Sequence, residues 1–373
     1  MIRKEYIHKG TFRCETGENI TDLKVVYHVS GHYFRDASTE EDALRALRLD
    51  AVSGRKKTVW ITHALTANSD PTDWWPELAG PGKFFDPDKY IVVCANMLGS
   101  AYGSSGPASP VPGSCTEENP EGTPYYFTFP RVTVRDIVNA EILLRKYLGI
   151  EKIDLIVGGS IGGFQALEWA IMEPDVIRNA AFIACGSRVT PWLTAHNEAQ
   201  RMALEADRTF RRCESLKGGA EGLKAARAMA LISYRSYEGY NATQSEQDVD
   251  TLFADRAASY ERYQGKKLAD RFDAYSYWYI TYSVDSHNVG RGRGGVAAAL
   301  GSVKSRSIVI GIDSDDLFPV EEQRYIAECI PGAEYHEITS RFGHDGFLLE
   351  YSQIAGILEP VLKDRLSPVV TLS

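Results

Sequence analysis

Short apolar runs rich in β-branched residues recur along this chain of 373 residues and alternate with segments of helical spacing. The runs occupy residues 58–61, 90–94, 153–157, 180–185 and 308–312. Each run has the length of a buried strand, and segment 134–148 carries apolar residues three and four positions apart, which is typical of a helix. Gly149 follows this segment and predicts its end. The alternation predicts a mostly parallel central sheet flanked by helices, which is an α/β fold.

The pattern changes between residues 190 and 300, where helical segments rich in alanine, arginine, glutamate and tyrosine replace the β-branched runs. We therefore predict a core formed by residues 1–189 and 301–373, with a helical cap inserted at 190–300. The proline- and glycine-rich segment 99–124 predicts a long functional loop. Residues 367–373 are expected to form a tail.

Composition narrows the class of function. The net charge is −9 at pH 7 and no block of lysine or arginine is present, so we expect no nucleic-acid partner and no anionic membrane partner. Six cysteines form no C-x-x-C pair and show no ligand spacing with histidine, which argues against a metal site or a disulfide framework. No signal peptide and no membrane-spanning apolar stretch is recognisable. We expect a soluble cytoplasmic protein that acts on small molecules.

Ser160 is the strongest candidate nucleophile. It lies within Gly158-Gly159-Ser160-Ile161-Gly162, directly after the predicted strand 153–157. A strand that turns into a helix within one residue strains the backbone of that residue and requires small neighbours two positions before and after it. Glycine–serine clusters are also common in ordinary strand-to-helix turns, so Ser160 needs partners to support a catalytic role.

Two further residues complete a candidate triad in the chain order Ser, Asp, His. His344 lies in a loop after the strand-like segment 334–338, and a base in that position could accept the serine proton. Among three aspartates in the loop after residues 308–312, we select Asp315 as the acid that orients His344. The alternative is that these aspartates only cap the helix that begins near Val320.

An oxyanion hole requires backbone N–H groups aimed at the reacting oxygen. We expect one from Ile161, which follows the nucleophile, and one from Leu65, in the loop after the predicted strand 58–61.

Seven motifs resemble the homoserine O-acetyltransferases of methionine biosynthesis, which have an α/β-hydrolase fold. They cover most of the chain in the expected order and are HALTANSD (63–70), NMLGSAYGSSGPAS (96–109), FPRVTVRDIV (129–138), GGSIGGFQALEWA (158–170), DSHNVGRGRGG (285–295), GIDSDDLFP (311–319) and GHDGFL (343–348).

The resemblance implies that Ser160 is the nucleophile, Asp315 the acid and His344 the base. It also implies that Arg201 pairs with the substrate carboxylate and that Asp345 meets its ammonium group, although Arg201 could instead be a solvated arginine of the cap. The implied reaction is a ping-pong transfer of acetyl from acetyl-CoA to L-homoserine. A homodimer is implied too, and no permanently bound cofactor or metal is.

Some alternatives stay open at this point. A succinyl donor or a serine acceptor would leave the triad unchanged, a carboxylesterase or lactonase would use the same three residues, and a non-catalytic binding protein on this scaffold is the weakest reading. Arg291 and Arg293, within GRGRGG, are expected to support the cap or to contact phosphates of coenzyme A.

Overall fold

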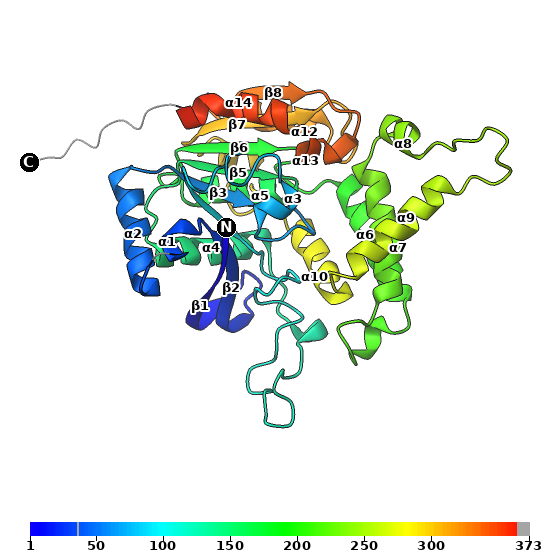
Figure 1. Ribbon diagram of the computed structural model, residues 1–373, viewed down its shortest axis with the longest axis horizontal. Coiled ribbons are helices and arrows are strands. Elements are labelled where there is room, and N and C mark those ends of the chain that lie inside the picture. The colour runs from blue at the N-terminus through cyan, green and yellow to red at the C-terminus, as the bar shows by residue number, and fades with distance from the viewer. Residues whose placement is uncertain (36, 364–373) are drawn as a thin grey trace, which may run out of the picture.

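The computed structural model describes residues 1–35 and 37–363 and contains one eight-stranded sheet. Its order is β1-β2-β4-β3-β5-β6-β7-β8, and β3 to β8 run parallel to one another (Figure 1). The strands are β1 (Ile2–Arg13), β2 (Asn19–Val29), β3 (Thr58–Thr62), β4 (Ile91–Ala95), β5 (Leu155–Gly159), β6 (Asn179–Ile183), β7 (Arg306–Ile312) and β8 (Glu334–Ile338). This arrangement confirms the predicted mostly parallel sheet.

Eight α-helices of the described residues belong to the parts of the chain before β6 and after β7. They are α1 (His32–Arg35), α2 (Glu40–Ser53), α3 (Pro71–Trp74), α4 (Val134–Leu148), α5 (Ile161–Met172), α12 (Val320–Cys329), α13 (Gly346–Leu349) and α14 (Tyr351–Lys363). The predicted helix 134–148 is confirmed as α4. Thr133 caps its N-terminus by accepting from the Asp136 N–H, and Gly149 ends it with φ of 71°, a left-handed conformation that suits glycine.

Six helices lie between β6 and β7 in the chain. They are α6 (Pro191–Ala206), α7 (Ala220–Tyr234), α8 (Tyr237–Gln244), α9 (Arg256–Ala269), α10 (Ala274–Asp285) and α11 (Val296–Leu300). Figure 1 shows α6 to α9 projecting to one side of the sheet. Helix α10 instead packs closely against the rest of the molecule, since the Ser283 hydroxyl donates to the Val132 carbonyl and the Tyr279 hydroxyl donates to the Phe129 carbonyl. The division into a core and a separate cap domain stays a prediction.

The antiparallel β1–β2 hairpin was not predicted. It joins the sheet through antiparallel pairing of β2 with β4. Half-buried and exposed positions alternate along β1, but the half-buried ones include Lys4 and His8 and the exposed ones include Ile7, so no apolar run marks this strand in the sequence. The expected loop 99–124 is confirmed, and the expected tail, 367–373, lies outside the described residues.

The sequence predicts neither a membrane-spanning helix nor a metal site. Within the residues that the structure describes, no helix has the length and apolar character needed to cross a bilayer. Across the same residues, histidine, cysteine and acidic side chains nowhere gather in threes as a metal site would require. The cytoplasmic location stays a prediction.

Candidate active site

The backbone at Ser160 is strained in the way that its sequence predicts. Strand β5 ends one residue before Ser160 and α5 begins one residue after it, and Ser160 has φ of 60° and ψ of −128°. A Cβ atom added to Gly158 would lie 2.2 Å from the Thr62 hydroxyl oxygen, and one added to Gly162 would lie 2.2 Å from the Thr62 carbonyl oxygen. Only glycine fits at either position, so β5, α5 and the end of β3 meet closely around the serine.

His344 and Asp315 lie together at the carboxyl ends of β7 and β8. The distance from His344 Nδ1 to Asp315 Oδ2 is 2.7 Å, and both side chains are buried. The backbone N–H groups of Leu317 and Phe318 each donate to Asp315 Oδ1 at 2.9 Å. Asp315 is therefore fixed as an acceptor for the Nδ1 proton. This leaves His344 Nε2 as the nitrogen that could act as a base, and it has no partner among the described residues.

Asp315 does not cap the helix that begins at Val320, which was the alternative role for this aspartate. Helix α12 has Pro319 at its N-cap position and no side-chain cap. Asp313, another aspartate of this loop, accepts from the Ser340 N–H at 3.0 Å. Asp315 is thus the aspartate of this loop that hydrogen-bonds to His344.

The loop that carries Leu65 is held from two sides. His63 Nδ1 donates to the Ala64 carbonyl at 2.8 Å, and the Met97 N–H donates to His63 Nε2 at 3.1 Å. The Gln165 side chain, from α5, donates to the His63 carbonyl at 3.1 Å. Burial lowers the pKa of His63 to about 4, so its ring stays neutral near pH 7 and Nε2 remains an acceptor. These bonds tie the loop after β3 to β4 and α5.

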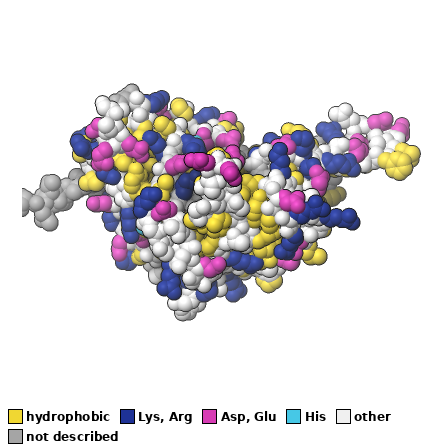
Figure 2. All heavy atoms as spheres, turned by 90° about the horizontal axis from the view of Figure 1, so that it is seen from below, with side chains coloured by type: hydrophobic (Ala, Val, Ile, Leu, Met, Phe, Trp, Pro, Cys, Tyr) yellow, Lys and Arg dark blue, Asp and Glu magenta, His cyan; other side chains and the backbone are white. Residues whose placement is uncertain are grey.

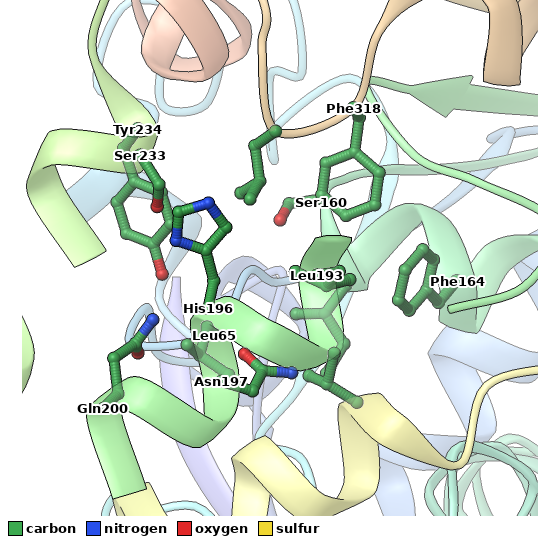
Figure 3. Close-up of a pocket in the computed structure, with 13 residues that line it drawn as sticks. Leu65, Ser160, Phe164, Leu193, His196, Asn197, Gln200, Ser233, Tyr234 and Phe318 are labelled. Atoms are coloured by element: carbon green, nitrogen blue, oxygen red, sulfur yellow. The ribbon is translucent and has the colours of Figure 1, made fainter. Parts of the chain in front are cut away.

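Two cavities meet at Ser160. The inner cavity has a volume of about 380 Å³ including its open mouth, and it is lined by Ile161, Phe164, Leu193 and residues of α7 and α10 (Figure 3). The outer cavity has a volume of about 960 Å³ on the same basis and is lined by His344 and by residues of α3, α7 and α9. Leu65, Ser160 and Tyr234 line both cavities. Because Leu65 and Ile161 border Ser160, their placement is compatible with the predicted oxyanion hole.

The outer cavity brings together an acidic and a basic side chain beside the candidate triad. Asp345 and Arg227 both line it, and Asp345 Oδ2 lies 2.5 Å from Arg235 Nε. Burial raises the pKa of Asp345, and the positive charges of Arg235 and Arg227 oppose this shift. The Arg227 guanidinium lies 5.6 Å from the centre of the Tyr234 ring. A carboxylate and a guanidinium in one cavity can bind the two charged groups of an amino acid.

Arg227 was missed by the sequence reasoning. It lies on α7 two turns before Tyr234 and on the same side as the buried residues Leu223 and Leu231. An arginine on the apolar face of an amphipathic helix was the available signal.

Comparison with known proteins places the chain in a family. The sequence profile described as alpha/beta hydrolase fold matches residues 57–351. A homoserine O-acetyltransferase of Cyclobacterium marinum is 44% identical over 309 residues, which cover 82% of this chain and 85% of the relative. The chain belongs to the homoserine O-acetyltransferase family of α/β hydrolases.

Solved structures with this fold include both a homoserine O-acetyltransferase and an ester hydrolase. A homoserine O-acetyltransferase from Bacillus anthracis has a TM-score of 0.82 at 19% identity and covers 98% of this chain and 99% of that one. An acetylester hydrolase from Corynebacterium glutamicum has a TM-score of 0.78 at 24% identity and covers 97% and 96%. At these identities the likeness shows the fold alone and confirms the predicted α/β-hydrolase fold.

In this member of the homoserine O-acetyltransferase family, Arg201 is not among the residues that line either cavity at Ser160. Its Nε lies 2.8 Å from Glu198 and its Nη2 lies 2.8 Å from Asp285, and only 3% of the side chain is exposed. Asp285 also accepts from the Asn197 amide at 2.7 Å. Arg201 therefore joins α6 to α10 and is not a solvated arginine. Contact with a substrate carboxylate stays a prediction that this placement does not support.

Arg291 and Arg293 connect the segment after α10 to the core of this family member. Arg291 pairs with Glu15 at 2.8 Å, and Arg293 pairs with Glu168 of α5 at 2.5 Å. Neither arginine is among the residues that line the two cavities. Their contacts favour the expected supporting role over contact with coenzyme A.

The turn at Ser160 generates a stability prediction. Changing Gly162→Ala is expected to lower the free energy of unfolding by about 2 kcal/mol or more, because the new methyl group would collide with the Thr62 carbonyl. Gly356→Ala is the matched control, since no atom lies within 4 Å of a Cβ at that position of α14. The control is expected to gain about 0.5–1 kcal/mol through reduced backbone entropy. Urea unfolding measures both, and equal stability of the two variants would contradict the packing described here.

Proposed function

We propose that this protein transfers the acetyl group of acetyl-CoA to the hydroxyl of L-homoserine through an acetyl-Ser160 intermediate. The observation that best supports this proposal is that one cavity is lined by Ser160, His344, Arg227 and Asp345. The names of relatives such as that of Cyclobacterium marinum support the same reaction. Acetyl-CoA is then a substrate, and no permanently bound cofactor or metal is required.

In the first half-reaction, His344 Nε2 accepts the Ser160 proton while Oγ attacks the thioester carbon. The N–H groups of Leu65 and Ile161 hold the oxyanion that forms. The C–S bond then breaks, and the departing thiolate takes the proton from His344. Asp315 stabilises the imidazolium in between, because its carboxylate is fixed by the His344 hydrogen bond and by two backbone donors.

In the second half-reaction, the homoserine hydroxyl loses its proton to His344 and attacks the acetyl carbon. The bond from that carbon to Ser160 Oγ then breaks, and Oγ takes the proton back from His344. Arg227 binds the homoserine carboxylate, and Asp345 binds the ammonium group. Asp345 follows His344 directly in the 3₁₀ turn Gly343–Asp345. An acceptor held there has its hydroxyl near the base, which favours transfer over hydrolysis.

Basic residues near the mouth of the outer cavity suit the phosphates of coenzyme A. Lys267 and Arg271 line this cavity, and Arg271 Nη1 donates to the Thr66 carbonyl at 2.7 Å, which holds its guanidinium in place. Lys267 makes no ion pair with the residues that the structure describes. A phosphate would provide the missing anionic partner.

The reaction is tested by measuring CoA release from acetyl-CoA with homoserine, with serine and with no acceptor. Release is expected to depend on homoserine, because the acetyl-enzyme needs an acceptor positioned by Arg227 and Asp345. Equal release without any acceptor would instead identify a hydrolase. A preference for serine would keep the mechanism and change the acceptor.

The acceptor site is tested by comparing two arginines. Arg227→Gln is expected to lower kcat/KM for homoserine by about 10- to 100-fold, the cost of losing a charged hydrogen bond, while acetylation of Ser160 by acetyl-CoA persists. Arg201→Gln is expected to act on folding instead, lowering the free energy of unfolding by about 3 kcal/mol because Asp285 loses its cation. The reverse pattern would restore Arg201 as the carboxylate ligand.

We also propose a homodimer formed through the cap. Met202, Ile232, Leu252 and Phe253 are exposed apolar residues of this part of the chain, and Figure 2 shows apolar side chains at the outer end of the projecting part. Such surfaces mark protein interfaces. Sedimentation is expected to give a dimer mass that Ile232→Asp reduces to that of a monomer. A monomer mass for the unchanged protein at every concentration would refute the dimer.

A further inference from the structure

The position of His344 assigns the two cavities to different parts of the reaction. This step rests on the proposed function. His344 must give a proton to the departing thiolate and take one from the acceptor hydroxyl, so both groups have to approach from the outer cavity, which His344 lines. The inner cavity also reaches Ser160, but His344 is not among its lining residues. The acyl group on Ser160 therefore extends into the inner cavity.

The inner cavity is larger than an acetyl group needs. The centre of a water-sized sphere can occupy about 30 Å³ of this cavity, which is more space than one methyl group needs. Phe164 and Phe318 lie on one side of Ser160 in Figure 3, and His196, Ser233 and Tyr234 lie on the other. Space thus remains beyond the methyl of an acetyl-serine.

The inner cavity is polar on one side but carries no full charge. Among the described residues, no lysine, arginine, aspartate or glutamate lines it. Burial lowers the pKa of His196, so this ring is neutral near pH 7, and its buried Nε2 atom has no hydrogen-bond partner in the described part of the chain. Gln200 Oε1 already accepts from the Tyr277 hydroxyl at 2.6 Å. The groups left to face an acyl chain are neutral.

We propose that the inner cavity is an acyl pocket that admits uncharged acyl groups of three or four carbons as well as acetyl, and rejects those ending in a carboxylate. The protein then also transfers propionyl and butyryl from their CoA thioesters to homoserine. In each case the bond to Ser160 Oγ forms first, the C–S bond then breaks, and the serine proton leaves with the thiolate through His344. Succinyl is rejected because its carboxylate would lose water without gaining a cation.

The experiment measures kcat/KM for acetyl-, propionyl-, butyryl- and succinyl-CoA with homoserine as acceptor. Butyryl and succinyl have chains of equal length, so their ratio isolates the effect of the carboxylate. Propionyl and butyryl are expected within about tenfold of acetyl, and succinyl about a hundredfold or more below butyryl. The proposal would be overturned by a kcat/KM for succinyl-CoA equal to that for butyryl-CoA. It would also be overturned if the kcat/KM values for propionyl- and butyryl-CoA were both a thousandfold below that for acetyl-CoA. Absence of homoserine-dependent transfer from acetyl-CoA would instead refute the proposed function.

A charge placed in the pocket provides the matched test. His196→Arg adds a cation to the lining of the inner cavity, and Ala195→Arg adds the same charge to the neighbouring, exposed position of α6, which does not line the cavity. The succinyl-to-butyryl ratio is expected to rise at least about tenfold in the first variant and to stay unchanged in the second. Equal ratios in both variants would overturn the assignment of the pocket.

Leu193→Phe is the second variant, in case His196→Arg does not fold. It narrows the inner cavity without adding charge, and it is expected to lower the butyryl-to-acetyl ratio at least about tenfold. An unchanged ratio in a folded Leu193→Phe protein would show that the acyl chain lies elsewhere and would also overturn the proposal.

Discussion

The left-handed backbone at Ser160 is the constraint on which the rest of the site depends. It exists because β5 turns into α5 within one residue, and because Gly158 and Gly162 let this turn pack against Thr62 at the end of β3. The same contact brings the loop after β3, with Leu65, beside the serine. Since β3, β5, β7 and β8 are parallel, the loops at their carboxyl ends reach one edge of the sheet, where Leu65, Ser160 and His344 lie.

The sequence predicts the parallel sheet, α4 and the strained serine because each has a local sequence pattern. The strands are β-branched runs, α4 has apolar residues three and four positions apart, and the serine is one polar residue among glycines. The hydrogen bond between Asp315 and His344 follows from their positions after neighbouring strands. Arg201 illustrates what local patterns do not contain, because its contacts with Asp285 depend on how α6 and α10 cross. The position of Arg227 in the outer cavity likewise exists only once the inserted helices fold against the sheet.

The inserted helices form much of the wall around the strained serine. Residues of α6, α7 and α10 line the inner cavity, and residues of α7 and α9 line the outer one. Helix α7 contributes Arg227 to the outer cavity and Tyr234 to both cavities. In the proposed reaction, this single helix thus borders both the space for the amino-acid acceptor and the space for the acyl group.

The central claim is that Ser160 carries the acyl group between donor and acceptor, and intact-protein mass spectrometry after mixing with acetyl-CoA alone tests it most directly. The account predicts that the mass rises by one acetyl group, that the added mass disappears when homoserine is supplied, and that Ser160→Ala never acquires it. Acetylation of the Ser160→Ala protein at the same rate, or transfer to homoserine by that variant, would contradict the account.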